Sequence, residues 1–265
     1  MQVNCGVSLQ KKDMIFDLTS DEIIQRGKLV RELRSPSVAS LYGVFKDRSK
    51  PADLLGSGTF VQHRDDIFVL TARHVLNDYK KYDYVFHDIG GDGELMYPFK
   101  GNWIGWSECK GDLALWGCFG ELFDSSKIHP MPLIEPFGST NEHEDAVFLT
   151  SGYPDEKALS LPFAGEYRTA LHTAMGKAAT LGSNPDHSFS FYCANDIKYF
   201  GMSGSGVWNL NLHKCESIAD WSPELSTFSG VLIQWVQNGH LIATKAEVVK
   251  KFLSGSIEQL RSQWN

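Results

Sequence analysis

Short apolar runs separated by turn-forming residues recur along most of this chain, and this spacing constrains its fold more than any other feature. Each run is shorter than an ordinary helix and suits a β-strand. No long stretch between them has helical periodicity, which argues against alternating β-α-β units. The pattern therefore predicts an all-β barrel or sandwich. The candidate strands cover residues 38–45, 56–61, 67–71, 84–87, 103–106, 112–118, 146–150, 169–172, 188–193, 206–209, 230–235 and 241–243.

Helical patterns are confined to the two ends of the chain. Thr19 and Glu22 have capping-box spacing ahead of apolar residues at helical intervals, and Pro36 then ends the predicted helix. The last segment has an apolar stripe among Lys, Glu and Arg, which predicts an amphipathic helix that packs on the second β unit. The stripe consists of Ala246, Val248, Val249, Phe252, Leu253, Ile257 and Leu260.

Composition places the chain among globular proteins and excludes several function classes. With 265 residues and 42% hydrophobic residues it can bury a core as one large domain or two small ones. A net charge of −7 disfavours a nucleic-acid partner, which needs a basic surface. No apolar run approaches the ~18 residues of a membrane span, and the N-terminal segment has no signal-peptide pattern. We therefore expect a cytoplasmic protein that binds neither nucleic acid nor membrane.

The five cysteines indicate neither a metal site nor a disulfide framework. Their number is odd and their spacing matches no metal motif, so in a cytoplasmic protein they are expected to be reduced. His187 with Cys193, and His213 with Cys215, are the nearest approaches to a ligand pair. Neither pair joins a four-ligand pattern. The sequence predicts no metal and no cofactor.

Three segments contain residue types that can carry nucleophilic chemistry. In residues 201–206, Gly-Met-Ser-Gly-Ser-Gly, the glycines allow a tight path that exposes a hydroxyl and lets backbone N–H groups converge. His74 follows the apolar strand at 67–71, where it can face a cleft. Asp112 begins another apolar strand and needs a hydrogen-bond partner there, which a histidine N–H would supply. Taken singly, each segment is more simply explained as a glycine turn, a structural histidine or an aspartate at a strand start.

Together the three segments resemble the active-site blocks of the trypsin/chymotrypsin-like serine protease family, in its order His, Asp, Ser. The family's Thr-Ala-Ala-His-Cys block appears as Thr-Ala-Arg-His-Val at 71–75, and its Asp-hydrophobic-Ala-Leu block as residues 112–115. Its Gly-Asp-Ser-Gly-Gly-Pro block appears as residues 201–206, and the Gly-Ser-Gly strand at 56–58 is similar too. The resemblance covers about residues 37–253, and its triad order differs from that of α/β-hydrolases and subtilisins.

The resemblance implies a fold and a role for each residue. The fold would be two six-stranded antiparallel β-barrels, with an N-terminal helical extension over 1–36, a first barrel over 37–130, and a second over 131–265 that includes the C-terminal helix. The loop at about 120–143 would separate the barrels. Ser203 would be the nucleophile, His74 the general base and Asp112 the carboxylate that orients it, with the backbone N–H groups of Gly201 and Ser203 as the oxyanion hole. Ser205 is a rival hydroxyl.

Two departures point to an intracellular, disulfide-free member of bacterial type. Val75 stands where secreted members have a cysteine, so their bracing disulfide is absent. Met202 stands where zymogens have an aspartate that pairs with a newly cut N-terminal amine. Activation by that cut should therefore be unavailable.

Substrate preference is less clearly indicated. The resemblance implies Ile197 as the floor of the primary specificity pocket, which favours an uncharged side chain, whereas a register shift of one residue would place Asp196 there and reverse the preference. Gln234 and Trp235 lie on the run resembling the strand that binds the substrate backbone.

The predicted function is a serine endopeptidase acting on a protein or peptide. The alternative is a catalytically silent fold used as a peptide-binding module. A third hypothesis is a latent protease whose site assembles when a regulatory protein docks, with the N-terminal helix as the docking element.

Overall fold

The computed structural model describes most of the two β units and both terminal helices. The described residues are 20–34, 37–47, 49–50, 52–88, 96–99, 102–107, 110–118, 131–132, 146–154, 158–160, 167–169, 171–179, 186–193, 199–215, 218–236 and 238–263.

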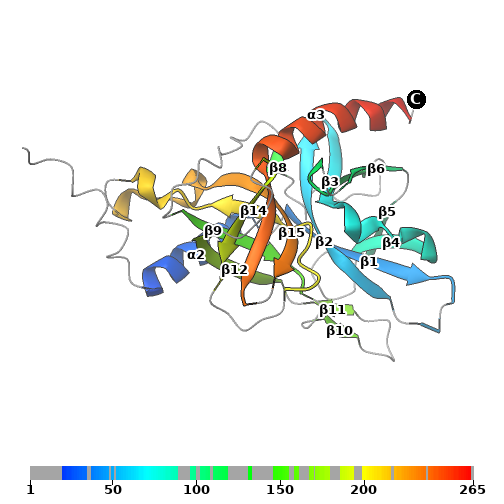
Figure 1. Ribbon diagram of the computed structural model, residues 1–265. Coiled ribbons are helices and arrows are strands. Elements are labelled where there is room, and N and C mark those ends of the chain that lie inside the picture. The colour runs from blue at the N-terminus through cyan, green and yellow to red at the C-terminus, as the bar shows by residue number, and fades with distance from the viewer. Residues whose placement is uncertain are drawn as a thin grey trace, which may run out of the picture.

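The first β unit is an antiparallel sheet curled into a half-barrel (Figure 1). Its strands follow the order β5-β4-β1-β2-β3-β7-β6, and β8 pairs with β2 in parallel. Successive residues of the central strands β2 and β3 are buried, and apolar ones such as Phe60 and Leu70 are fully so. The strands are β1 (Val38–Phe45), β2 (Asp53–His63), β3 (Asp66–Ala72), β4 (Tyr82–Asp88), β5 (Met96–Phe99), β6 (Trp103–Trp106), β7 (Leu113–Gly117) and β8 (Met131–Pro132).

The second unit is a closed antiparallel barrel in the order β12-β13-β16-β15-β14-β9. Its interior is aromatic and aliphatic, and Phe148 packs against both Phe189 and Phe191. Strands β10 (Ala158–Ser160) and β11 (Tyr167–Thr169) form a separate two-stranded sheet. The barrel strands are β9 (Val147–Gly152), β12 (His172–Ala179), β13 (Ser188–Tyr192), β14 (Gly206–Asn209), β15 (Thr227–Val236) and β16 (His240–Lys245).

Short 3₁₀ turns connect several of these strands. They are η2 (Arg73–Leu76), η3 (Tyr79–Lys81), η6 (Leu212–Lys214), η7 (Ile218–Asp220) and η8 (Pro223–Leu225).

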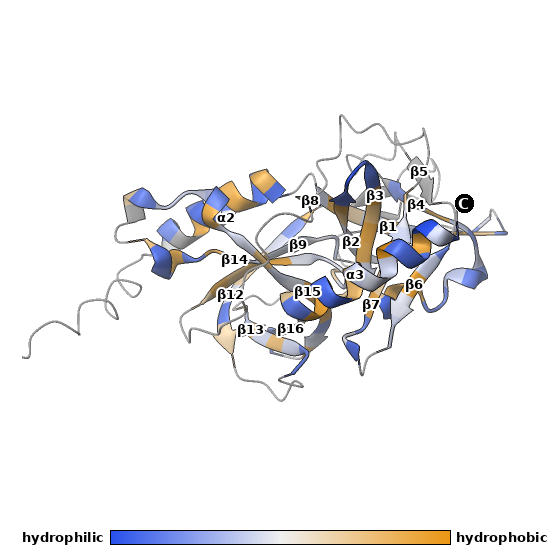
Figure 2. Cartoon of the chain, turned by 90° about the horizontal axis from the view of Figure 1, so that it is seen from above, coloured by the Kyte–Doolittle hydropathy of each residue, from blue (hydrophilic) through white to orange (hydrophobic). Residues whose placement is uncertain are grey.

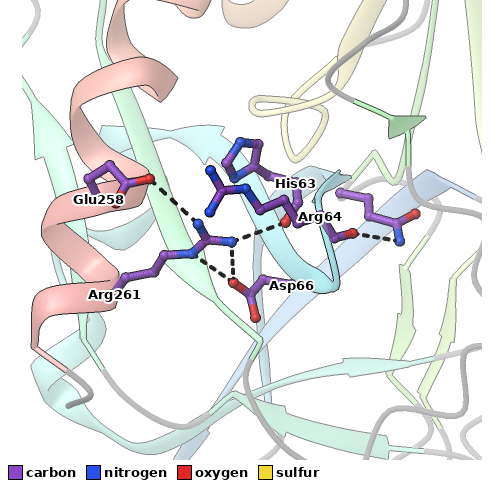
Figure 3. Close-up of polar contacts among 6 residues, drawn as sticks. His63, Arg64, Asp66, Glu258 and Arg261 are labelled. Atoms are coloured by element: carbon purple, nitrogen blue, oxygen red, sulfur yellow. Dashed lines mark hydrogen bonds and ion pairs between the residues drawn. The ribbon is translucent and has the colours of Figure 1, made fainter.

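Helix α3 (Ala246–Ser262) lies across both β units (Figure 1). Hydrophilic and apolar residues alternate along it (Figure 2), and its buried side chains join a hydrophobic cluster that contains Leu70 of β3 and Phe228 of β15. At its far end Arg261 donates from Nε and Nη2 to Asp66 Oδ2, over 2.8 and 2.6 Å, and from Nη2 to the His63 carbonyl oxygen (Figure 3). The helix therefore begins directly after β16 and ends bound to the β2–β3 hairpin.

Helix α2 (Ser20–Arg34) packs on the second barrel. Val30 is fully buried in the cluster shared by both units, and the Arg34 guanidinium lies 4.2 Å from the centre of the Trp208 ring. A Cβ added at Gly27 would lie 3.1 Å from Met175 Sδ, so the glycine lets the helix approach β12 closely.

The predicted fold class is confirmed: an all-β, chymotrypsin-like arrangement with helices at both ends. The predicted cap at Thr19 and stop at Pro36 lie outside the described residues, as does most of the loop at 120–143. No helix in the described part of the chain is both long and apolar enough to cross a membrane. The division at residue 130 stays a prediction.

One buried histidine belongs to the core of the first unit. His87 Nδ1 lies 3.0 Å from the backbone nitrogen of Ser40, and its ring packs edge-on against Phe60. Because burial disfavours the charged imidazolium, the pKa of His87 falls from 6.5 to about 4. We therefore expect this side chain to be neutral at physiological pH.

Candidate active site

His74 is presented by the turn η2, directly after β3. Val75 and Leu76, the next two residues, are buried in the core of the first unit and fix the turn. The His74 side chain itself remains 38% exposed. A 3₁₀ turn anchored on two apolar residues thus holds an imidazole at the surface.

Asp112 lies beside this turn because β3 and β7 are neighbours. The register pairs Ala72 with Leu113, so the residue just before β7 lies next to the residue just after β3. The Arg73 N–H donates to the Asp112 carbonyl oxygen over 2.9 Å. Asp112 has a φ of 50°, a left-handed conformation that Asp and Asn tolerate better than most residues.

The His74 and Asp112 side chains form a closely bonded pair. His74 Nδ1 lies 2.6 Å from Asp112 Oδ2, and the His74 backbone N–H donates to Asp112 Oδ1 over 3.2 Å. The Asp112 side chain is only 8% exposed, so its charge needs these partners. Because a carboxylate accepts, Nδ1 carries a proton in this pair and Nε2 of the neutral ring is the basic nitrogen.

Ser203 lies in a tight loop that two glycines make possible. Gly201 and Gly204 have φ values of 88° and 95°, and a Cβ at Gly204 would overlap the Ser57 carbonyl oxygen. The Met202 side chain is fully buried and anchors the loop in the second barrel. The Gly204 N–H donates to the Leu232 carbonyl oxygen of β15 over 2.7 Å. The loop is therefore fixed on both sides of Ser203.

The backbone N–H groups of Gly201 and Ser203 are the expected oxyanion hole, and the Met202 N–H between them already has an acceptor. The Met202 N–H donates to the Tyr199 carbonyl oxygen over 3.1 Å. Within the described residues, the N–H groups of Gly201 and Ser203 donate to no acceptor. Both remain available to an incoming anion.

Burial separates the two candidate hydroxyls. Ser203 is half-buried, whereas Ser205 is fully buried and its Oγ has no partner among the described residues. A substrate could reach Ser205 only after the loop rearranged. The geometry therefore favours Ser203 over its rival.

Strand β2 brings the histidine turn and the serine loop together. The Ser57 N–H donates to the Ser203 carbonyl oxygen over 2.9 Å. A Cβ at Gly56 would lie 2.8 Å from Val75 Cγ2 and 3.1 Å from the Ser203 carbonyl oxygen, so this glycine touches both segments. No hydrogen bond joins the His74 and Ser203 side chains among the described residues. The structure thus brings the two segments into contact, and the His74 side chain is bonded to Asp112 and not to Ser203.

The predicted substrate-binding residues are only partly described. Ile197 and Asp196 lie outside the described residues. Gln234 on β15 is exposed, and Trp235 is half-buried with its ring centre 5.0 Å from that of Phe200, which is 57% exposed. Sequence reasoning missed Phe200, although an aromatic residue directly before Gly201 could have indicated it. It also assigned no role to Ser57.

Two of the described cysteines, Cys118 and Cys193, are buried, and burial disfavours the reactive thiolate. Burial raises the pKa of Cys118 strongly and that of Cys193 to about 12. Within the described residues no three side chains of the His, Cys, Asp and Glu types converge on a metal-sized site.

Sequence comparison finds no match for this chain, whereas structural comparison does. No family model matches it, and no curated protein matches its sequence. The HtrA-type protease AlgW with a tripeptide superposes with a TM-score of 0.55 at 15% identity, over 88% of this chain and 64% of AlgW. A variant of AlgW gives a TM-score of 0.54 at 15% identity. A protein named HBP gives 0.57 at 12% identity, over 84% of this chain and 91% of its own.

These likenesses show a shared fold. The chain spans just under two thirds of AlgW, so that protein's activity does not transfer by similarity.

Proposed function

We propose that this chain is a serine endopeptidase that cleaves proteins or peptides through an acyl-enzyme. The observation that carries the proposal is the 2.6 Å pair between His74 and the buried Asp112, held by β2 against the glycine-bounded loop of Ser203. A surface histidine with a buried carboxylate on Nδ1 has the form of an activated general base. The fold shared with AlgW supports the proposal.

The first half of the reaction forms the acyl-enzyme. Ser203 Oγ attacks the carbonyl carbon of the scissile bond, and its proton passes to His74 Nε2. The carbonyl oxygen becomes an oxyanion that accepts from the N–H groups of Gly201 and Ser203. When the C–N bond breaks, the leaving amine takes the proton from Nε2.

The second half releases the product and restores the enzyme. Water attacks the ester carbon and gives a proton to His74 Nε2, which passes it to Ser203 Oγ as the C–O bond breaks. Asp112 stays ionised throughout and stabilises the transient imidazolium. The hydrogen bond between His74 and Ser203 is then expected to form when substrate binds, as such contacts often tighten in the complex.

A fluorophosphonate probe tests the proposal. It should label the purified wild-type chain, and labelling should vanish in Ser203→Ala and fall steeply in His74→Ala. Ser205→Ala is the matched control, since its hydroxyl is buried two residues away, and it should label like the wild type. Absence of labelling in the wild type, or its persistence in Ser203→Ala, would refute the proposal.

The alternative of a catalytically silent peptide-binding module rests on the missing His74–Ser203 hydrogen bond. It predicts peptide binding without labelling in any state. A latent, partner-activated protease predicts labelling only after a docking protein is added. Deletion of residues 1–35 tests whether the N-terminal helix carries that docking, with thermal unfolding measured in parallel because the deletion also removes the buried Val30.

Peptide-library profiling would then address specificity. Ile197 as pocket floor predicts preference for an uncharged side chain, and Asp196 in its place predicts preference for a basic one. The cytoplasmic location also stays a prediction.

A further inference from the structure

The side chain of Ser57 joins strand β2 to the nucleophile loop. Ser57 is fully buried, and its hydroxyl donates to the Gly201 carbonyl oxygen over 2.8 Å. The same hydroxyl oxygen accepts from the Tyr153 N–H over 2.9 Å, just beyond β9. One hydroxyl thus links the first sheet, the second barrel and the loop that carries Ser203.

The backbone of Ser57 extends this set of contacts. Its N–H donates to the Ser203 carbonyl oxygen over 2.9 Å, and its carbonyl oxygen accepts from Thr71 Oγ1 over 2.7 Å. Thr71 lies three residues before His74 on the same chain segment. Ser57 therefore bonds to both the histidine segment and the serine loop.

The contact to Gly201 restrains the peptide group that follows the proposed oxyanion donor. The carbonyl of the Gly201–Met202 peptide is held by Ser57, and its N–H by the Tyr199 carbonyl oxygen. Glycine at a φ of 88° has no side chain to limit its rotation. Because its carbonyl and its N–H are both hydrogen-bonded, this peptide group cannot rotate freely despite the glycine.

We propose that Ser57 is a positioning residue that holds the Gly201 carbonyl toward β2 and so keeps the Gly201 N–H directed at the forming oxyanion. The inference rests on the proposed function. The Met202 side chain is fully buried and apolar, so it can form no ion pair or hydrogen bond that would fix this peptide group. The polar restraint on the loop from β2 comes instead from a neutral hydroxyl.

Two glycines next to Ser57 leave room for these close contacts. A Cβ at Gly204 would overlap its carbonyl oxygen, and one at Gly152 would lie 2.9 Å from its Oγ. Gly204 leaves room for the Ser57 carbonyl, and Gly152 leaves room for the hydroxyls of both Ser57 and Ser205. A side chain at either position would displace the contacts that hold the loop.

Ser57→Ala tests the inference through kinetics, with Ser205→Ala as the matched control. Both remove a buried serine hydroxyl, but only the first hydroxyl is bonded to the loop. We expect Ser57→Ala to lower kcat and the rate of fluorophosphonate labelling about tenfold or more, with KM within about twofold, since an oxyanion donor acts mainly on the transition state. Ser57→Cys fills the site with a slightly larger side chain that is only a weak donor, so its labelling rate should also fall, which serves if the alanine variant folds poorly.

Amide and carbonyl NMR signals of Gly201 give a readout that does not depend on activity. In Ser57→Ala both should shift, and in Ser205→Ala both should stay near their wild-type positions. Unchanged Gly201 signals, or a folded Ser57→Ala that labels within twofold of wild type, would overturn the inference. A wild type that does not label would instead refute the proposed function, and the Gly201 signals would then decide the role of Ser57 alone.

Discussion

Replacing Asp112 by Asn tests the His74–Asp112 pair with little change of shape. The carboxylate now accepts from His74 Nδ1 over 2.6 Å and from the His74 backbone N–H over 3.2 Å. An amide can keep the second contact through its oxygen, but it then presents NH₂ to Nδ1. The imidazole must switch its proton to Nε2, where it cannot accept the proton of Ser203.

The expected loss is a factor of about 10⁴ in kcat, which corresponds to about 5.5 kcal/mol of transition-state stabilisation. Folding should be nearly unaffected, because Asn is also tolerated at a φ of 50° and has the same volume. Asp112→Ala should lose activity as well, but it should also lower the melting temperature, since alanine is strained at that φ and leaves the His74 contacts unmade.

The assay compares the variants by fluorophosphonate labelling rate and by turnover of a peptide substrate, with thermal unfolding measured in parallel. A folded Asp112→Asn protein that retained more than a tenth of wild-type activity would refute the assignment of Asp112. A variant that lost activity only because it unfolded would show a structural role instead.

Three further predictions concern stability. The pKa of His87 is lowered from 6.5 to about 4, so the unfolded chain binds the proton more readily, and stability should fall by about 3 kcal/mol as the pH drops from about 6.5 to about 4. Denaturant titrations at both pH values should show this fall in the wild type and a smaller one in His87→Gln. Cysteines at Gly56 and Val75 should form a disulfide, because a Cβ at residue 56 would lie 2.8 Å from Val75 Cγ2, close to the ~3 Å that a disulfide requires between one Cβ and the opposite sulfur. That bond should stabilise the chain by about 3 kcal/mol, and a melting temperature insensitive to reductant would contradict it. Arg261→Ala should cost about 1–2 kcal/mol in chemical unfolding through its partly buried bonds to Asp66, and a loss below about 0.5 kcal/mol would show that the α3 anchor contributes little.

Local patterning was enough to predict an all-β chain with a helix near each end, and the family resemblance supplied the arrangement in two barrels. The run at 38–45 coincides with β1, and the stripe from Ala246 to Leu260 coincides with the buried side of α3. The helix shows its period clearly because one side faces a core, whereas β1 is a continuous, mostly buried run recognised by its length and composition. The half-barrel curl of the first sheet and the parallel pairing of β8 with β2 depend on contacts between distant strands, which a local pattern does not encode.

The candidate site divides in the same way. His74, Asp112 and Ser203 could be named as candidates because their chemistry shows in the side chain and in the flanking residues. Ser57 could not, because its proposed role lies in a bond to one backbone carbonyl 144 residues away. Any small residue between glycines fits a strand equally well, so the sequence carries no sign of such a bond.

The placement of these residues makes the proposed activity depend on contacts between the two β units. His74 and Asp112 both belong to the first unit and stay paired through the neighbouring strands β3 and β7. Ser203 belongs to the second, and reaches them through the bonds of Ser57 and the contacts of Gly56. Thr244 Oγ1 adds a second bridge, donating from β16 to the Gly111 carbonyl oxygen directly before Asp112. A slight separation of the units would therefore leave the His74–Asp112 pair intact but move Ser203 away from His74. We expect loss of activity to precede loss of secondary structure as the chain is heated.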